Sequence, residues 1–221
     1  MGLDVSAKGG GDFELVPPGV YVAVCDRVID LGKQESGNPK FKSSKQVYIR
    51  WNLPAVRIKW TEEGGEEKEG PAIIGAYYTQ TLGRNSKLLK MLQSLHGKPL
   101  TAEQLANFDV FKLLGHSCQV SIMHEKKADG GERAIINAIM PLPAGQPRPQ
   151  SELDPIGYSI DGQSVVAGVP RSSPEVHAML SEYFRGKIDS RIVDAAAPGS
   201  AAPAASGAAT TGADGYVDPF A

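Results

Sequence analysis

The sequence predicts a mainly β protein with a few helices, and three patterns carry that prediction. Successive side chains fall on two distinct faces over residues 19–31 and 45–53, as they do in strands, and residues 71–82 are interpreted as another strand. The period becomes helical over residues 86–97, where leucines recur every three or four positions. Two further alternating runs surround a Gly-Gly turn within residues 115–142, which indicates a β-hairpin. We therefore expect three strands, a helix and two more strands, in that order.

The second predicted strand, residues 45–53, separates its side chains into two faces. Its apolar residues share one face: Val47, Ile49 and Trp51. Tyr48 and Arg50 share the other face, so they would border an open groove if the apolar set faces the core. Pro54 interrupts the pattern, and residues 56–60 resume it as a continuation of the strand or as an edge segment.

Capping residues mark where the predicted helices begin and end. Residues 86–97 have Asn85 or Ser86 as the N-cap and Gly97 at the C-terminal end. A second, short helix is predicted over residues 101–108, where the first residue, a threonine, would be the cap.

A third helix is predicted over residues 173–188, with Ser173 as the cap and Pro174 at the first helical position. Its apolar residues would form a single stripe along one face: Val176, Met179, Leu180, Tyr183 and Phe184.

Five strands with a helix between the third and the fourth follow the order of the OB-fold. That fold is a partly open barrel that commonly holds oligonucleotides. Other small β-barrels fit the same pattern, so the order alone leaves them open. We expect a five-stranded OB-like barrel, followed by a C-terminal helix and a disordered acidic tail.

Composition divides the chain into four parts. Residues 1–12 are predicted to be a flexible N-terminus, and residues 13–145 an OB-like nucleic-acid-binding domain. Residues 146–194 form a proline-rich extension with a helix, in which residues 151–190 could be a homodimer contact or a cap on the barrel. Residues 195–221 are rich in Ala, Gly, Pro, Ser and Thr, which indicates a disordered linker with an acidic tip.

Charge is unevenly distributed along the chain. Residues 1–150 hold 19 Lys and Arg against 16 Asp and Glu, whereas residues 151–221 hold 4 against 9. Residues 27–59 hold eight basic residues and only two acidic ones. A basic body before an acidic tail points to a nucleic-acid or membrane-surface partner. The basic residues fall mostly on strands rather than on one amphipathic helix, which favours nucleic acid over a membrane.

The N-terminal residues carry acids and glycines where a signal peptide needs a basic start and an apolar stretch. No run of 18 apolar residues occurs, so we expect no membrane span and a cytoplasmic protein. Cys25 and Cys118 are too few for a disulfide scaffold, and we expect reduced thiols in the core.

Motifs of catalysis are scarce. The sequence has no P-loop, no G-x-G-x-x-G and no H-E-x-x-H, and its four histidines show no metal-ligand spacing with the cysteines. We therefore expect a protein without catalytic residues, metal or cofactor. The alternative is a metal-dependent nuclease or processing factor that uses Asp26, Asp30 and the glutamates of residues 62–69.

Basic residues interleaved with aromatic ones indicate binding of single-stranded nucleic acid. Cations along a groove neutralise phosphates, and exposed rings stack on unpaired bases. The candidate phosphate contacts are Lys40, Lys42, Lys45, Arg50, Lys59, Arg84 and Lys87. The candidate stacking rings are Tyr48, Trp60 and Tyr77, since Tyr77 and its neighbour Tyr78 must point to opposite faces of a strand.

Several segments within residues 13–145 resemble a group of bacteriophage and prophage proteins. They are GVYVAVCDRVIDLG, the strand end W-N-L-P, YYTQTLGRNSKLLKMLQSLHGKPLT and LLGHSCQVSIMHE. The group comprises single-stranded-DNA-binding and replication-associated proteins with an OB-like barrel. The resemblance implies a protein of phage DNA replication or recombination that coats single strands without strong sequence preference in the host cytoplasm.

The C-terminal GYVDPF resembles the acidic tip of bacterial single-stranded-DNA-binding proteins. In that family the tip recruits replication and repair enzymes, because its Phe enters an apolar pocket and its carboxylates meet basic residues. The matching residues here are Asp214, Asp218, Pro219 and Phe220, and Ala221 follows them. The remaining alternative is a protein-interaction module that does not bind DNA.

Overall fold

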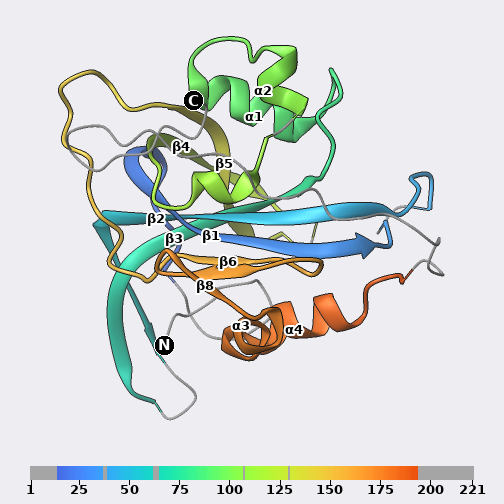
Figure 1. The fold of residues 1–221 in the computed structure, drawn as a ribbon. Coiled ribbons are helices and arrows are strands. Elements are labelled where there is room, and N and C mark those ends of the chain that lie inside the picture. Colours follow the sequence, from blue (N-terminus) through green and yellow to red (C-terminus); the bar gives the residue numbers. More distant parts are fainter. Residues whose placement is uncertain (1–13, 37–38, 62–64, 107, 129, 194–221) are drawn as a thin grey trace.

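The first strand lies at the centre of the fold in this computed structural model, which describes residues 14–36, 39–61, 65–106, 108–128 and 130–193 (Figure 1). The five longest strands are β1 (Gly19–Gln34), β2 (Ser44–Thr61), β3 (Glu67–Thr79), β4 (Ser117–Lys126) and β5 (Glu132–Pro141). β1 pairs with β4 along its first six residues and with β2 along the rest, and both pairings are antiparallel. β3 extends the sheet beyond β2, and β5 extends it beyond β4.

The predicted order of three strands, a helix and two strands is confirmed. The prediction of a five-stranded barrel is wrong, because the sheet formed by the described residues has eight strands and is not closed. Three short strands follow the predicted five: β6 (Ile156–Tyr158), β7 (Ser164–Val166) and β8 (Val169–Arg171). β6 pairs in parallel with β1, so the C-terminal extension continues the main sheet. Within the described ranges, β3 and β5 lie near each other but no ladder joins them.

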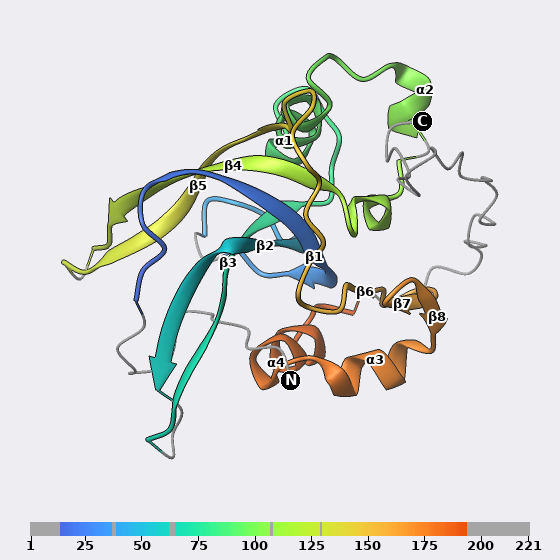
Figure 2. The same ribbon diagram turned by 90° about the vertical axis from the view of Figure 1, so that its left-hand side faces the viewer.

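Pro54 does not end the second strand. β2 continues to Thr61 through a register shift between Leu53 and Arg57, so the proline sits where the ladder is interrupted. The two strands then pair as far as Thr61 and Glu67, and Figure 2 shows that this end of the β2–β3 hairpin extends away from the rest of the molecule. Of the two interpretations of residues 56–60, the continuation of the strand is confirmed.

Two predicted helices form where their caps indicate. In α1 (Lys87–His96), the Ser86 Oγ accepts a hydrogen bond from the Leu89 N–H at 3.3 Å, and Gly97 ends the helix with a left-handed φ of 76°. In α2 (Ala102–Ala106), the Gln104 N–H donates to the Thr101 Oγ1 at 3.2 Å. A short 3₁₀ helix, η1 (Val110–Leu113), leads into β4.

The predicted helix over residues 173–188 is two helices, α3 (Ser173–Met179) and α4 (Glu182–Asp189), and Ser172 rather than Ser173 is the N-cap. Leu180 adopts an extended conformation between them and is buried, so the chain turns to place this side chain in the core. Met179, predicted in the apolar stripe, is instead 51% exposed.

Two apolar cores lie on opposite faces of the strands. The larger core joins the inward side chains of β1–β5 to one face of α1, and it includes Trp51 and Tyr78. The smaller core lies between the other face of β1 and β2 and the helices α3 and α4, and Phe184 is fully buried in it. The C-terminal helices therefore cover the face of β2 that the sequence pattern suggested was open.

No helix in the described part of the chain is long and apolar enough to cross a bilayer. The predicted flexible N-terminus, residues 1–12, and the predicted linker and tip, residues 195–221, lie outside the described residues.

Candidate nucleic-acid interface

Arg50 is buried in the sheet rather than exposed in a groove. Its side chain has no exposed surface, and its Nε lies 3.1 Å from the Asp26 Oδ1. Asp26 is also fully buried, and the Arg27 guanidinium lies 4.0 Å from its Oδ2. The Arg50 charge is thus neutralised inside the protein, and the prediction that it meets a phosphate is wrong.

Tyr48 lies under the C-terminal helices. It is 9% exposed, and its ring centroid is 4.7 Å from that of Phe184 and 4.9 Å from that of Tyr77. The prediction that Tyr48 stacks on a base is therefore wrong, because the ring is buried and packs against Phe184 and Tyr77. The alternation pattern placed Tyr48 correctly on the outer face of β2, but α4 covers that face.

Tyr77 and Tyr78 point to opposite faces, as their adjacency requires. Tyr78 is buried in the main core, and Tyr77 is 40% exposed at the edge of α4. The Tyr77 hydroxyl is 3.1 Å from that of Tyr183, and the Lys187 Nζ lies 5.9 Å from the Tyr77 ring centroid. Tyr77 is thus partly exposed and is already held by α4.

Lys59 and Trp60 lie on the extended part of the β2–β3 hairpin. Lys59 is exposed, whereas the Trp60 ring packs against Gly70 and the main core. A Cβ at Gly70 would lie 2.9 Å from the Trp60 ring, so the glycine is required by this close approach. The contacts of the Trp60 ring do not support a stacking role.

Three predicted lysines gather at the turn between β1 and β2. Lys40, Lys42 and Lys45 are all exposed, and Phe41 between the first two is 67% exposed. Sequence reasoning missed Phe41 as a candidate ring. The sequence did contain a signal for its exposure, because an aromatic residue between two lysines in a polar loop is not expected to pack in the core.

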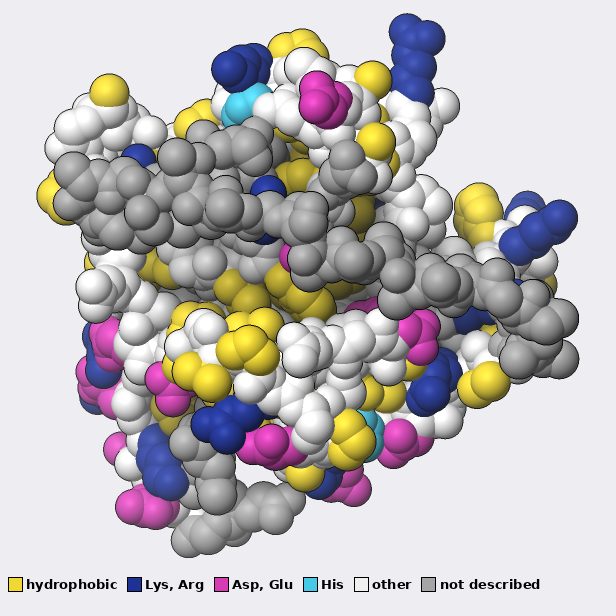
Figure 3. All heavy atoms as spheres, viewed as in Figure 1, with side chains coloured by type: hydrophobic (Ala, Val, Ile, Leu, Met, Phe, Trp, Pro, Cys, Tyr) yellow, Lys and Arg dark blue, Asp and Glu magenta, His cyan; other side chains and the backbone are white. Residues whose placement is uncertain are grey.

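Arg84 lies on the β3–α1 connection, and Lys87 is the first residue of α1. The Gln80 N–H donates to the Lys45 carbonyl at 2.8 Å and the Gln80 Nε2 to the Gln46 carbonyl at 2.9 Å, which fixes the start of this connection beside β2. Both cations are exposed. Figure 1 shows the turn and the connection on the same side of the molecule, and Figure 3 shows Lys and Arg side chains projecting from this side at separate places.

We call this group the hairpin-end cluster; its members are Lys40, Phe41, Lys42, Lys45, Arg84 and Lys87. It contains five of the seven predicted phosphate contacts and none of the predicted rings.

A cavity of about 320 Å³, here called the Phe pocket, lies beside this cluster. Its buried apolar lining comes from three elements: Val28, Val47 and Leu88. Half-buried apolar side chains complete it: Leu82, Phe108, Val110 and Phe111. Its polar lining consists of Asp30, Gln80, Asp109 and Ser159. Sequence reasoning missed this site, although two phenylalanines three residues apart before a strand were a visible signal.

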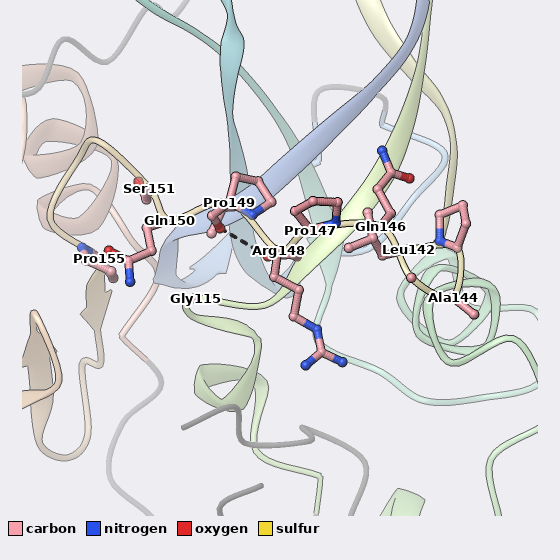
Figure 4. A pocket seen from close by; sticks show the side chains of 14 residues that line it. Gly115, Leu142, Ala144, Gln146, Pro147, Arg148, Pro149, Gln150, Ser151 and Pro155 are labelled. Carbon is pink, nitrogen blue, oxygen red and sulfur yellow. Dashed lines mark hydrogen bonds between the residues drawn. The ribbon is translucent and has the colours of Figure 1, made fainter. Parts of the chain in front are cut away.

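A larger cavity, of about 800 Å³, lies between the β5–β6 connection and the strands β1 and β4 (Figure 4). Four of its fourteen lining residues are prolines, and the Ser117 Oγ donates to the Pro149 carbonyl at 3.3 Å. Arg148 is the one charged side chain among its described lining residues. Binding of a polynucleotide backbone requires several cations that meet successive phosphates, and a single arginine does not provide them.

The two aspartates considered for a nuclease are both engaged by other residues of the protein. Asp26 is paired with Arg50, and Asp30 Oδ1 accepts hydrogen bonds from the Gly32 N–H and the Gln80 Nε2. Among the described residues, no three His, Cys, Asp or Glu side chains come close enough together to hold a metal ion. Glu62 and Glu63 lie outside the described residues.

Both cysteines are free and buried, which confirms their predicted place in the core. Burial raises the pKa of the Cys25 thiol well above its usual value, and the nearby Asp26 carboxylate adds to this shift. Burial likewise raises the pKa of the Cys118 thiol. Neither thiol is therefore activated as a nucleophile.

The predicted partner-binding residues Asp214, Asp218, Pro219 and Phe220 lie outside the described residues. Comparison of the chain with protein-family models, with curated proteins and with solved structures gave no match.

Proposed function

We propose that this chain is a single-stranded-DNA-binding protein of phage DNA replication or recombination. It coats exposed strands without strong sequence preference, and its C-terminal tip recruits replication or recombination enzymes. The observation that carries the proposal is the hairpin-end cluster, where five exposed cations accompany an exposed ring. The resemblance of residues 13–145 to phage single-stranded-DNA-binding proteins supports the same assignment.

The cluster suits an unpaired strand for two physical reasons. Cations that meet phosphates release condensed counterions, which gives affinity without reading sequence. An exposed ring stacks on any base, because every base has a flat π-face. Phe41 offers such a ring between Lys40 and Lys42, whereas Tyr48 and Trp60 are engaged by other side chains.

We further propose that β1–β5 with α1 form an OB-like core that is open between β3 and β5. In this interpretation β6–β8 enlarge the sheet, and α3 and α4 cover the outer face of β2. The covered face shifts the binding surface toward the turn between β1 and β2.

Fluorescence anisotropy of labelled oligonucleotides tests the proposal. We expect single strands of mixed sequence to bind more tightly than duplexes of the same sequence. If all five cations contact phosphates, the slope of log K against log salt should be about −3 to −4. The label must be on the DNA, because Trp51 is fully buried and Trp60 packs against the core.

Two outcomes would overturn this function. Absence of binding at low salt, together with capture of a protein partner by the purified chain, would make it a protein-interaction module. Strand cutting that depends on magnesium would make it a processing enzyme.

A further inference from the structure

We propose that the Phe pocket holds one base of the bound strand, and that Asp30 makes it favour bases with an exocyclic amino group over thymine. This inference rests on the proposed function and adds a local base preference to otherwise sequence-tolerant binding. It is argued from the lining of the pocket, the contacts of Asp30 and the charges around the rim.

The pocket has the size and lining that a base needs. Its volume of about 320 Å³ is at the lower end of the range for small-ligand sites. Val28, Val47 and Leu88 close it with buried aliphatic side chains, while Phe108 and Phe111 contribute aromatic ones. An apolar space with aromatic walls favours a flat, weakly polar ring over a phosphate or a sugar.

The Asp30 carboxylate is oriented by two donors on the same oxygen. The Gly32 N–H donates to its Oδ1 at 2.9 Å, and the Gln80 Nε2 donates to the same atom at 2.6 Å. No described residue donates a hydrogen bond to Oδ2. Because Asp30 lines the pocket, we take its Oδ2 as the acceptor that a bound base would meet.

A fixed carboxylate acceptor distinguishes the two pyrimidines. Cytosine presents an N4 amino group, which donates to a carboxylate, whereas thymine presents the O4 carbonyl at the same position. Thymine would place two acceptors against each other and leave both without a donor. The two bases have nearly the same size, so the group at position 4 is the difference that the Asp30 carboxylate would recognise.

Charge around the pocket matches a strand that inserts a base and keeps its phosphates outside. Each wall carries an exposed cation within two residues of a lining side chain: Lys45 near Val47, Arg84 near Leu82, Lys87 beside Leu88 and Lys112 beside Phe111. The two carboxylates, Asp30 and Asp109, belong to the lining itself. Phosphates are thus attracted to the rim and repelled from the interior.

The test compares oligo-dC with oligo-dT of equal length, with anisotropy as the readout. We expect the wild-type protein to bind oligo-dC about 5- to 10-fold more tightly, the effect of one good contact to a base edge. Asp30→Asn should remove or reverse this ratio, because its amide can donate to the thymine O4 while its Oδ1 keeps the contacts to Gly32 and Gln80.

Asp109→Asn is the matched control. It removes the same charge from the same pocket, and the asparagine can still accept the hydrogen bond from the Phe111 N–H. We expect it to leave the ratio of dC to dT affinity unchanged. A ratio that changes in Asp109→Asn but not in Asp30→Asn would overturn the assignment to Asp30.

The outcomes separate this inference from the function on which it rests. Equal binding of oligo-dC and oligo-dT by the wild-type protein would overturn the pocket and leave the proposed function intact. No binding of either strand would overturn both. If Asp30→Asn does not fold, Phe108→Leu replaces it, and a base in the pocket then requires weaker binding of oligo-dC by about 5-fold or more.

Discussion

The guanidinium of Arg50 and the carboxylate of Asp26 form a fully buried ion pair on the outer face of the sheet, with Nε 3.1 Å from Oδ1. Two adjacent strands supply the partners, since Arg50 lies on β2 and Asp26 on β1. The pair replaces the phosphate contact that the sequence pattern suggested for Arg50. It makes a charged residue part of the fold rather than part of the binding surface.

Removal of one partner of this pair should strongly destabilise the protein. Asp26→Asn leaves the buried Arg50 charge without its counter-ion, and we expect the free energy of unfolding to fall by about 3–5 kcal/mol. Urea denaturation measures this change. Arg57→Ala is the control, because its pair with Glu152 is about half exposed and should contribute little. Equal effects of the two substitutions would contradict the structural role of Asp26.

The position of the Tyr48 side chain leaves no room for a larger residue in place of Gly75, so we expect a substitution there to be destabilising. A Cβ at Gly75 would overlap the Tyr48 hydroxyl and the adjacent ring carbon, because β2 and β3 place the two residues close together. We expect Gly75→Ala to lower the free energy of unfolding by about 1–3 kcal/mol, the usual cost of overpacking.

Gly83→Ala provides the comparison for Gly75. No atom lies within 4 Å of its Cβ position, so this variant should unfold within about 0.5 kcal/mol of the wild type. In Gly75→Ala the added methyl group should couple to Tyr48, so combination with Tyr48→Leu should cost less than the sum of the two single substitutions. Additive costs would contradict the proposed overlap.

The elements predicted correctly are those whose signal is local. α1 has an N-cap at Ser86, a left-handed Gly97 and helical spacing between them, so a short window defines it. β6–β8 have three residues each, which is too short for a period to be recognised. The sequence could therefore predict the order of the first five strands but not the strands that extend the sheet.

The exposure of the candidate site residues was predicted in part for the same reason. Exposure of Lys40 and Lys42 follows from a polar loop, which is a local property. Burial of Tyr48 depends on Phe184, which arrives from a helix far along the chain, and no pattern within β2 contains that information. Alternation shows which residues share a face, but it does not show whether another element covers that face.

Stability should fall at high pH because of Tyr78. Burial raises the pKa of Tyr78 to about 12 from its usual value of 10. The folded state therefore holds this proton more tightly than the unfolded state, so the stabilisation is complete below pH 10 and is lost as the pH rises from 10 to about 12. The total loss is about 3 kcal/mol for two pKa units.

Urea denaturation at several pH values above 8 would measure this loss, and Tyr78→Phe is the informative variant. It should be less sensitive to pH above 10 than the wild type, because it has no phenol to ionise. Cys25 and Cys118, whose pKa values are also raised, should still contribute a decline in both proteins. An identical decline in the two proteins would show that Tyr78 ionises equally easily when folded and unfolded.

The lysines at the turn between β1 and β2 should determine much of the salt dependence of DNA binding. Replacement of Lys40, Lys42 and Lys45 with alanine would remove three of the proposed phosphate contacts, so the slope of log K against log salt should decrease in magnitude by about 2. Affinity at low salt should fall as well, by a similar factor for every sequence, because phosphates carry no sequence information. Anisotropy titrations at a series of salt concentrations measure both effects.

The control for this variant must remove the same charge from elsewhere. Lys98, Lys126 and Arg171 are exposed, and they lie on the α1–α2 connection, β4 and β8 respectively. Their replacement with alanine changes the net charge equally, so a long-range effect of net charge would weaken binding in both variants alike. A local contact at the turn predicts that only the first variant loses slope. If the slope decreases equally in both variants, the position of the removed cations makes no difference. The hairpin-end cluster would then not be where the strand binds.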